Sequence, residues 1–377
     1  MLGNKIVIVL PDLGGGGAER LHVHLANDWV SRGLAVEFVL LRNQGDLLTL
    51  LSPEVTVRVL GVNRIREAVF PLAVYLRTSC PQIVLAAMWP LTSAVVAAWW
   101  LSGRHGKLFL SEHSNLSHTY IIPAINFSIY LKSMIRFTYP LANGIVAVSH
   151  GVMKDLCSLG GLSFDKARVI YNPCAIGISP LPESLAVRDH LWGSGFTHHI
   201  LSVGRLTLQK DHETLIKAFA LLPKDPRTKL VILGEGPLRE RLLVFVAQLG
   251  LQERIFLPGF VKDVYPWFRS SDLFVLSSTF EGFGNVIVEA LECGVPVVST
   301  NCPSGPAEIL ENGRFGKLVP VQDPVALAYA MEQTLNQICD RKALRLRAKD
   351  FSVQKISNEY LAYFTSRGGE LSISKLE

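Results

Sequence analysis

The sequence is poor in charge and lacks the patterns of several protein classes. Only 18% of its 377 residues are charged while 49% are hydrophobic, which excludes an intrinsically disordered chain. The formal net charge is +5, and residues 1–185 hold most of the excess, with 15 Lys and Arg against 11 Asp and Glu. So small and diffuse an excess predicts no nucleic acid partner and only weakly favours an anionic ligand or a membrane face.

The sequence also contains few cysteines, and one of its segments carries no charged residue. The six cysteines form no C-x-x-C pair and no metal-like cluster, so we expect reduced thiols in a cytoplasmic protein. No charged residue lies between positions 80 and 103, a length that suits a transmembrane helix. Pro81 and Pro90 interrupt this segment and favour a strand at 83–87 followed by a buried helix at 91–101. A membrane span is therefore the weaker alternative.

Short apolar runs alternate with helical patterns along the whole chain, whose length suits two domains. Apolar strands separated by helices are typical of parallel sheets covered on both faces. The sequence therefore predicts an α/β protein with two Rossmann-like, doubly wound parallel-sheet domains. The expected strands are 6–10, 35–41, 55–60, 83–87, 107–111, 144–149, 168–171, 200–203, 229–233, 255–257, 273–276, 295–299 and 317–319, and the expected helices include 18–32, 211–222, 237–249 and 285–293.

The domain boundaries are expected near a segment rich in proline and small residues, 172–195, which is interpreted as a linker. We expect a first Rossmann-like domain at 1–185, including the start of the linker, and a second Rossmann-like domain at 186–355. A C-terminal helix and tail at 356–377 are expected to pack back towards the first domain. Two such sheets would leave a cleft at the carboxyl ends of their strands, where ligands of doubly wound sheets bind.

A glycine run, LPDLGGGGAER, follows the first strand and opens a helix. Glycines there let backbone N–H groups approach an anion at a helix N-terminus. A dinucleotide site needs an acidic residue where the second strand ends, and that strand ends in Leu41 and Arg42. This counts against a nicotinamide-dependent dehydrogenase. A tight turn without a ligand stays an alternative, since a glycine run alone is weak evidence.

Two cations follow the first strand of the second domain, in SVGRLTLQKDHETLIKAF. Arg205 and Lys210 precede a helix that Asp211 is suited to cap. Each cation alone would be an ordinary solvated residue. Together, at the end of a buried strand, they are suited to bind a diphosphate, Arg through its fork and Lys as a point charge.

Two glutamates eight positions apart frame a glycine turn in TFEGFGNVIVEALECGVPVV. We expect Glu281 in the loop after a strand and Glu289 one turn into the next helix. Gly282 and Gly284 free the backbone so that the N–H groups of residues 283–286 can point at phosphate oxygens. A carboxylate accepts two hydrogen bonds and so suits the vicinal hydroxyls of a sugar or a ribose. An exposed helix residue is the alternative for Glu289.

These motifs in combination, EGFGNVIVEA, GRL with a following lysine, GEGP, LPGF and CPSGPAEIL, resemble the retaining glycosyltransferases of family 4 (group 1), which have the GT-B fold. The resemblance covers nearly the whole chain. It implies that the two cations hold the donor diphosphate, that Glu281 binds the donor sugar and that Glu289 binds the ribose. The segment LSEHS resembles the histidine loop of the family's first domain, which implies that His113 lies near the transferred sugar.

The site implied by the resemblance spans both domains, and the glycine run is expected across the cleft beside donor and acceptor. The implied donor-binding residues are Gly15, Gly16, Gly17, Glu19, Arg205, Lys210, Glu281, Phe283, Gly284, Asn285, Val286 and Glu289, and the implied catalytic residues are His113, Glu281, Arg205 and Lys210. Where the family has Asn-Gly-Val-Asp before the linker, this chain has Asn172-Pro-Cys-Ala, so no role is transferred to that segment.

The implied reaction moves a sugar from a nucleotide-diphospho-sugar, with a UDP-sugar favoured, to a glycan or lipid-linked saccharide in cell-surface polysaccharide or glycolipid synthesis. Front-side attack is expected, because no second carboxylate is placed as a nucleophile. The cations and backbone amides can stabilise the departing diphosphate, and the chain lacks Asp-x-Asp, so no metal or other cofactor is expected. The alternatives are a nucleotide-sugar epimerase or phosphorylase on the same fold, and a catalytically inactive sugar-nucleotide binding protein.

The sequence gives a weaker signal for acceptor binding than for donor binding. We expect acceptor binding to involve residues 118–140. This stretch is apolar and aromatic, with only Lys132 and Arg136 charged, four positions apart on one helix face. A membrane-surface helix that meets a lipid-linked acceptor and a partly buried core helix are both compatible with the pattern. The first would bring the protein to the inner face of the cytoplasmic membrane.

Overall fold

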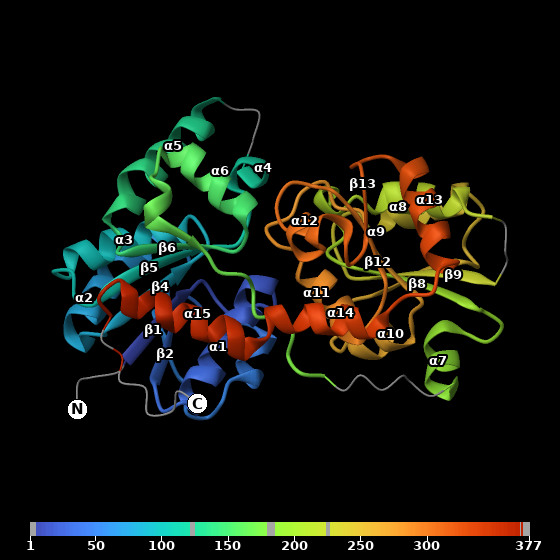
Figure 1. Cartoon of the computed structure of the whole chain (residues 1–377). Coiled ribbons are helices and arrows are strands. Elements are labelled where there is room, and N and C mark those ends of the chain that lie inside the picture. The colour runs from blue at the N-terminus through green and yellow to red at the C-terminus, as the bar shows by residue number, and fades with distance from the viewer. Residues whose placement is uncertain (1–4, 121–124, 179–184, 224–226, 370, 372–377) are drawn as a thin grey trace. The chain divides into compact units, whose positions relative to one another are not determined.

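The computed structural model describes residues 5–120, 125–178, 185–223, 227–369 and 371 of the chain and divides it into two compact units (Figure 1). The first unit joins Met1–Pro173 to Val353–Glu377, and the second unit is Cys174–Ser352. The divisions fall after residues 173 and 352, before the expected boundaries at 185 and 355.

The earlier division has a physical reason in the backbone around Ala175. The N–H of Ala175 donates to the carbonyl of Phe351 at 3.1 Å, both within the second unit. The carboxylate of Glu292 accepts hydrogen bonds from the backbone N–H groups of residues 176–178. The start of the expected linker is therefore tied to the second unit.

The first unit is built on a seven-stranded parallel sheet in the order β3-β2-β1-β4-β5-β6-β7. Helices α2, α3, α5 and α6 bury one face of the sheet, and α1 and α15 bury the other, which is why most of its strands are apolar throughout. The bounds are β1 Lys5–Leu10, α1 Gly17–Ser31, β2 Ala35–Leu40, β3 Thr56–Val59, α2 Val69–Ser79, β4 Ile83–Ala87, α3 Leu91–Leu101, β5 Lys107–Glu112, α4 Leu116–Tyr120, α5 Ile125–Thr138, β6 Gly144–Ala147, α6 His150–Gly160, β7 Ala167–Val169 and α15 Val353–Ser366.

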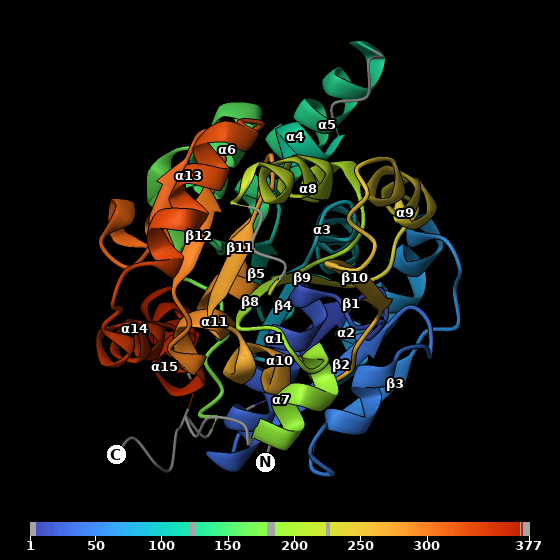
Figure 2. The same ribbon diagram turned by 90° about the vertical axis from the view of Figure 1, so that its right-hand side faces the viewer.

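The second unit is built on a six-stranded parallel sheet in the order β10-β9-β8-β11-β12-β13. Helices α8, α9 and α13 pack on one face, and α10, α11 and α14 lie on the other (Figure 2). The bounds are α7 Leu185–Trp192, β8 His198–Val203, α8 His212–Leu221, β9 Thr228–Leu233, α9 Arg239–Gln248, β10 Ile255–Gly259, α10 Tyr265–Ser270, β11 Leu273–Leu276, α11 Asn285–Cys293, β12 Val297–Thr300, α12 Pro306–Ile309, β13 Lys317–Val319, α13 Pro324–Leu335 and α14 Arg341–Ala348.

The two sheets share one winding pattern, which confirms the predicted pair of doubly wound domains. Each expected strand is present, and its ends lie within two residues of the predicted ones. In each sheet the chain first winds outward on one side and then continues on the other, so the direction switches between β1 and β4 and between β8 and β11. Ligands of such sheets bind beyond the carboxyl ends of the strands at this switch point. The loops after these strands are therefore the first place to look for a site.

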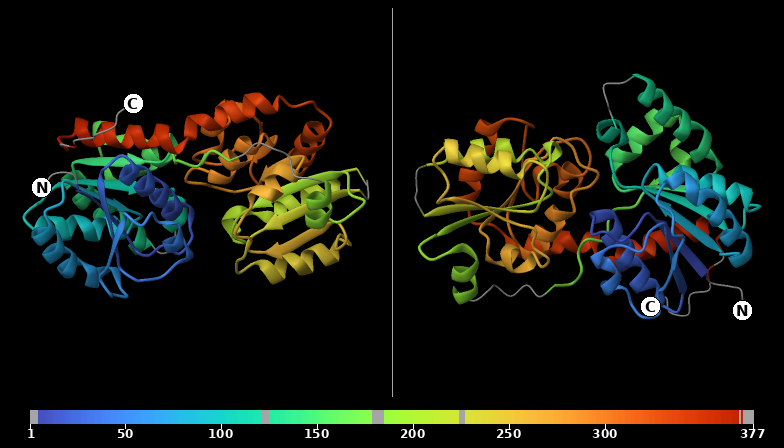
Figure 3. Two further views of the ribbon diagram at one scale, coloured as in Figure 1. Left: turned by 90° about the horizontal axis from the view of Figure 1, so that it is seen from below. Right: turned by 180° about the vertical axis from the view of Figure 1, so that it is seen from behind.

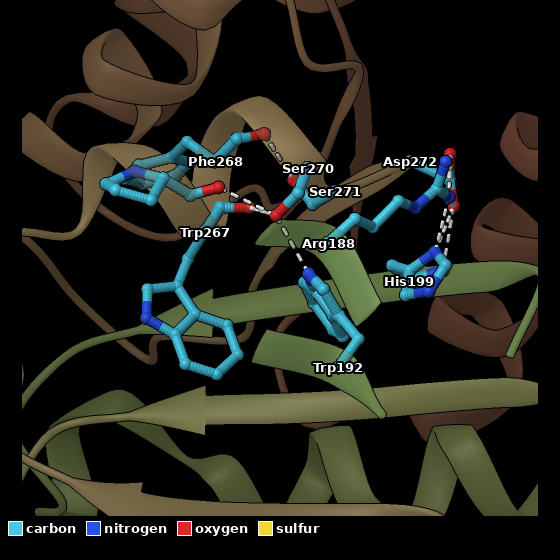
Figure 4. Close-up of polar contacts among 9 residues, drawn as sticks. Arg188, Trp192, His199, Trp267, Phe268, Ser270, Ser271 and Asp272 are labelled. Atoms are coloured by element: carbon cyan, nitrogen blue, oxygen red, sulfur yellow. Dashed lines mark hydrogen bonds and ion pairs between the residues drawn. The ribbon is translucent and has the colours of Figure 1, made fainter. Parts of the chain in front are cut away.

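The expected linker contains a short helix, α7, which was not anticipated. Side chains anchor this helix to the amino end of the second sheet (Figure 4). Arg188 contacts the carboxylate of Asp272 at 3.0 Å, and the indole N–H of the fully buried Trp192 donates to Ser270 Oγ at 2.8 Å. His199, at the start of β8, also bonds to Asp272. This anchoring is tertiary, so the composition of the segment did not reveal it.

The last helix, α15, belongs to the first unit and lies beside α1 (Figures 1 and 3). Its aromatic residues Tyr360 and Phe364 are fully buried against Trp29 of α1. The chain's C-terminal helix thus completes one face of the first sheet.

The charge-free segment forms β4 and α3, as the prolines predicted. In the described part of the chain, every helix is too short or too polar to span a bilayer.

Candidate active site

The loops that follow β8 and β11 meet through an ion pair. Lys210 Nζ lies 2.5 Å from Oε1 of Glu281, and Ser278 Oγ donates to the same oxygen at 2.6 Å. The Glu281 side chain is 8% exposed and that of Lys210 is 17% exposed, so water screens their attraction only weakly. The structure thus brings together two residues that the sequence singled out separately, and adds Ser278, which it did not.

Residues 204–210, the cation loop, are held in place by the loop after β11. Ser277 Oγ donates to the carbonyl of Lys210 at 2.8 Å, and the N–H of Thr279 donates to the carbonyl of Gln209 at 2.8 Å. These bonds fix the backbone that carries the lysine. The position of its charge is therefore set before any ligand arrives.

The GEGP motif supports the cation loop from another side. A Cβ on Gly234 would lie 2.1 Å from the carbonyl oxygen of Gly204, and one on Gly236 would lie 2.4 Å from that of Leu206. Both contacts are with backbone atoms, which cannot move aside as a flexible side chain would. The two glycines thus permit a close backbone approach that any larger residue would prevent.

Arg205 lies in the same loop with an exposed side chain, and within the described residues its guanidinium has no hydrogen-bond or ion-pair partner. The loop ends at Asp211, whose carboxylate accepts hydrogen bonds from the backbone N–H and the hydroxyl of Thr214. This cap confirms the predicted start of α8. Arg205 is thus a cation held on an ordered loop with its hydrogen-bond donors unused.

The glycine turn before α11 is formed as the sequence predicted. Gly284 has a φ of +102° and is the N-cap of the helix, where it makes no side-chain cap hydrogen bond. Gly305 approaches so closely that a Cβ there would lie 1.8 Å from the carbonyl oxygen of Phe283. The Phe283 ring is 2% exposed and packs on Phe351, so Phe283 can offer a ligand only its backbone.

Glu289 is half-buried on α11, one turn after Asn285. Burial, followed by the nearby carboxylates of Glu289 and Glu292, raises the pKa of Tyr265 above its ordinary range. Glu289 is therefore neither a fully solvated helix residue nor a fully buried core residue.

In the first unit, the glycine run forms the start of α1. Gly15 has a φ of +100°, which favours glycine, and Gly16 is the N-cap. A Cβ on Gly16 would lie 2.3 Å from Oε2 of Glu19, so this carboxylate folds back over the helix start. Gly45, which the sequence analysis overlooked, packs against the loop at Leu13. An anion at this helix start would therefore meet a carboxylate of the chain itself, which the sequence analysis did not foresee.

His113 follows β5 in the same unit. Its Nε2 lies 2.9 Å from Ser111 Oγ, whereas its Nδ1 is buried and has no hydrogen-bond partner among the described residues. The ring packs edge-on against His22 of α1, with centroids 5.2 Å apart. Burial and then the neighbouring His22 hold the pKa of His113 well below its ordinary value. The imidazole is therefore neutral at pH 7.

The residue before it, Glu112, is a fully buried carboxyl that the sequence analysis did not single out. It accepts hydrogen bonds from Tyr139, from Thr92 Oγ1 at 3.1 Å and from the backbone N–H of Trp89 at 3.3 Å. Burial raises its pKa to about 7, although these donors act in the opposite direction. Its place in LSEHS, directly before the histidine, was the signal available in the sequence.

Among the described residues, His, Cys, Asp and Glu side chains form no group of three suited to hold a metal ion.

Two family models match most of the chain. The model for Glycosyltransferase Family 4 matches residues 15–176, and the model for Glycosyl transferases group 1 matches residues 197–351. A protein of Campylobacter jejuni, N-acetylgalactosamine-N,N'-diacetylbacillosaminyl-diphospho-undecaprenol 4-alpha-N-acetylgalactosaminyltransferase, is 35% identical over 268 residues, which cover 69% of this chain and 70% of that protein. The chain belongs to glycosyltransferase family 4 (group 1).

This glycosyltransferase also resembles a second Campylobacter jejuni enzyme, GalNAc-alpha-(1->4)-GalNAc-alpha-(1->3)-diNAcBac-PP-undecaprenol alpha-1,4-N-acetyl-D-galactosaminyltransferase, at 27% identity over 377 residues, or 95% of this chain and 97% of the relative. Among solved structures, the HepE protein of Anabaena with bound UDP-glucose matches with a TM-score of 0.78 at 22% identity, covering 96% of this chain and 100% of that one. The likeness confirms the expected GT-B fold.

Proposed function

We propose that this glycosyltransferase transfers a sugar from a UDP-sugar to a lipid-linked saccharide with retention of the anomeric configuration. The observation that carries the proposal is the shielded pair of Lys210 and Glu281, formed where β8 and β11 end. A cation and a carboxylate at this point suit a ligand with a phosphate at one end and sugar hydroxyls at the other. A UDP-sugar has this chemistry.

The second unit supplies the groups that the donor needs. The exposed guanidinium of Arg205 and the ammonium of Lys210 would hold the diphosphate. When the diphosphate binds Lys210, Glu281 becomes available to accept hydrogen bonds from the donor sugar. Glu289 would accept hydrogen bonds from the ribose, and His113 of the first unit would lie near the transferred sugar.

The chemical step is a front-side displacement. The bond from the anomeric carbon to the diphosphate oxygen breaks, and the acceptor hydroxyl forms a new bond to that carbon on the same face. The hydroxyl proton moves to the departing diphosphate oxygen. The two cations stabilise the charge that develops on the diphosphate, which removes the need for a metal in the proposed step.

The lipid-linked acceptor is supported by the relatives and by the surface of α5. Both Campylobacter jejuni relatives are named for undecaprenol-linked acceptors. On α5 the side chains of Ile129, Tyr130 and Phe137 are 58%, 52% and 71% exposed, and the exposed cations Lys132 and Arg136 accompany them. Exposed apolar and basic side chains on one helix suit the surface of an anionic membrane. We therefore extend the proposal to contact between α5 and such a membrane.

The test is a screen of UDP-sugars and GDP-sugars with and without a polyprenyl-diphosphate-linked saccharide. Release of UDP with formation of an elongated lipid-linked product is the expected result. Donor consumption that does not depend on acceptor would instead indicate an epimerase or a phosphorylase. Tight donor binding without release of nucleoside diphosphate would indicate an inactive binding protein. Pelleting of the wild type, but not of an Ile129→Ser/Phe137→Ser double variant, with anionic vesicles tests the membrane contact.

A further inference from the structure

A chain of hydroxyl groups links the C-terminal helix to His113. Ser111 Oγ lies 2.9 Å from His113 Nε2 and 3.3 Å from the phenol oxygen of Tyr360. Ser111 and Tyr360 are fully buried, and all three residues belong to the first unit. The positions of the hydrogens are therefore inferred from the donors and acceptors that these buried groups contact.

The buried phenol of Tyr360 determines the direction of the hydrogen bonds that run from Tyr360 through Ser111 to His113. Within the described part of the chain, Ser111 is the one hydrogen-bond partner of Tyr360, so the phenol hydrogen must point to Ser111 Oγ. The hydroxyl of Ser111 then has His113 Nε2 as its remaining acceptor. Nε2 must therefore be unprotonated, and in a neutral imidazole the proton then lies on Nδ1.

The opposite arrangement is less favourable. If Nε2 of His113 donated to Ser111, the serine would donate to Tyr360, and the phenol hydrogen would be buried without an acceptor. The lone pair on Nδ1 would be buried without a donor as well. Two buried polar groups would then lack partners instead of one. Because each such group destabilises the fold, the first arrangement prevails.

The neighbouring histidine is consistent with this arrangement. His22 Nδ1 lies 2.7 Å from the carbonyl of Ala18, which can only accept, so the proton of His22 is on Nδ1. Its Nε2 is bare and, among the described residues, without a partner. His22 therefore offers no proton to the ring of His113 that it packs against.

We propose that Tyr360 of the C-terminal helix, acting through Ser111, is a positioning residue that holds His113 as the Nδ1–H tautomer. The inference rests on the proposed function for one point, namely that His113 lies near the transferred sugar. It gives α15 a role in the site beyond covering the sheet. The packing of Tyr360 on Trp29 and Phe364 keeps the phenol in place.

The tautomer itself is measurable without substrate. In the full-length protein with ¹⁵N-labelled histidine at pH 7, long-range ¹H–¹⁵N correlation spectra distinguish Nδ1–H, Nε2–H and doubly protonated rings. His113→Gln identifies the signals of His113. The expected wild-type pattern is Nδ1–H, and Ser111→Ala and Tyr360→Phe should both move it towards Nε2–H. Wild-type His113 signals that show Nε2–H or a charged ring would overturn the proposal, and apart from the assignment by His113→Gln this result needs no variant.

Kinetics supply the second readout. Tyr360→Phe removes only the hydroxyl, so kcat should fall about threefold to tenfold, the loss of one hydrogen bond, while KM for the donor stays within about twofold. Tyr363→Phe is the matched control, because this tyrosine lies on the same helix but bonds to Ile145 and Lys166. Its kcat and its His113 spectrum should match the wild type. Equal effects of both variants would show that the hydroxyl of Tyr360 acts on folding alone.

Failure of this inference is distinguishable from failure of the proposed function. If no sugar donor is turned over but His113 is the Nδ1–H tautomer and responds to Tyr360→Phe, the positioning stands and the proposed reaction is wrong. If transfer occurs and the tautomer is Nε2–H, the reaction stands and the positioning is wrong.

Discussion

The first unit surrounds its candidate residues with neutral groups, whereas the second surrounds them with charges. The contrast is clearest between two buried glutamates that both lie at the carboxyl end of a strand or just beyond it. Glu112 is held by a phenol, a hydroxyl and a backbone N–H, and burial raises its pKa to about 7. Glu281 has the ammonium of Lys210 at 2.5 Å.

The difference teaches that the partner, and not burial alone, decides the charge of a carboxyl. Neutral donors only partly offset the cost of removing a carboxylate from water, whereas a cation at contact distance offsets much more of it. The neutral groups of the first unit suit the binding of sugar hydroxyls, and the charged groups of the second unit suit the binding of a diphosphate. Four predictions break or sharpen this comparison.

The largest effect is expected from removal of the cations of the second unit. Arg205→Ala and Lys210→Ala each remove a charge-assisted contact to the donor worth about 1.5–3 kcal/mol, so donor turnover should fall at least tenfold. Lys210→Ala should also destabilise the protein, because it leaves Glu281 buried without its cation. Steady-state kinetics and urea melts measure both effects.

Lys217→Ala is the control, since this lysine is 48% exposed and pairs with Glu213 on the same helix. It should retain wild-type turnover. Wild-type kinetics in both Arg205→Ala and Lys210→Ala would remove these residues from the site.

The charge of Glu112 should make the stability of the protein depend on pH. Its pKa is about 7 in the folded state against 4.5 for the ordinary carboxyl, so the folded state holds the proton more tightly. The stabilisation from this carboxyl is complete below pH 4.5 and is lost as the pH rises through 7. Glu112→Gln mimics the protonated form. Its free energy of unfolding should therefore increase by about 2 kcal/mol relative to that of the wild type as the pH rises from 5 to 8.

Glu37 in the same unit provides a control of opposite sign. Burial raises its pKa, but Lys5, Tyr75 and Arg58 outweigh this effect and leave the pKa below its ordinary value. The Glu37 carboxylate stabilises the folded protein at neutral pH, and this stabilisation is lost as the pH falls. Glu37→Gln should therefore lower the free energy of unfolding more at pH 7 than at pH 3. Urea unfolding between pH 3 and pH 8 measures both effects. If the free energies of unfolding of Glu112→Gln and the wild type changed in parallel with pH, a raised pKa of Glu112 would be contradicted.

The two carboxylates of the second unit should differ in kinetic role. Glu281→Gln should lower kcat about tenfold, because contacts to the transferred sugar strengthen as its anomeric carbon becomes positive. Glu289→Gln should chiefly raise KM, because the ribose is bound alike in the ground and transition states. Both constants, with the affinity for free UDP, test the roles. They are reversed if Glu281→Gln weakens UDP binding and Glu289→Gln does not.

The smallest effect is expected from removal of metal. If Arg205, Lys210 and the backbone amides stabilise the diphosphate, excess EDTA should leave the initial rate of transfer nearly unchanged. Loss of activity with chelator, and its return with magnesium or manganese, would show that the second unit needs a further cation.

Much of the fold could be predicted from local patterns. Apolar runs such as 83–87 and 273–276 form buried strands wherever a parallel sheet is covered on both faces, so their place follows from composition and spacing. The glycine at 284 likewise marks its own turn, because few other residues adopt its φ of +102°. Such signals depend on neighbours in sequence, and a single sequence carries them.

The contacts that give the candidate site its chemistry were decided by the tertiary structure. Lys210 meets Glu281 across 71 residues, and Ser111 meets Tyr360 across 249. The anchoring of α7 through Arg188 and Asp272 is of the same kind. The sequence determined which strands and turns form and offered both charges of the second unit. The folded chain alone decided which groups share a buried space, and hence which glutamate is paired with a cation and which nitrogen of His113 carries the proton.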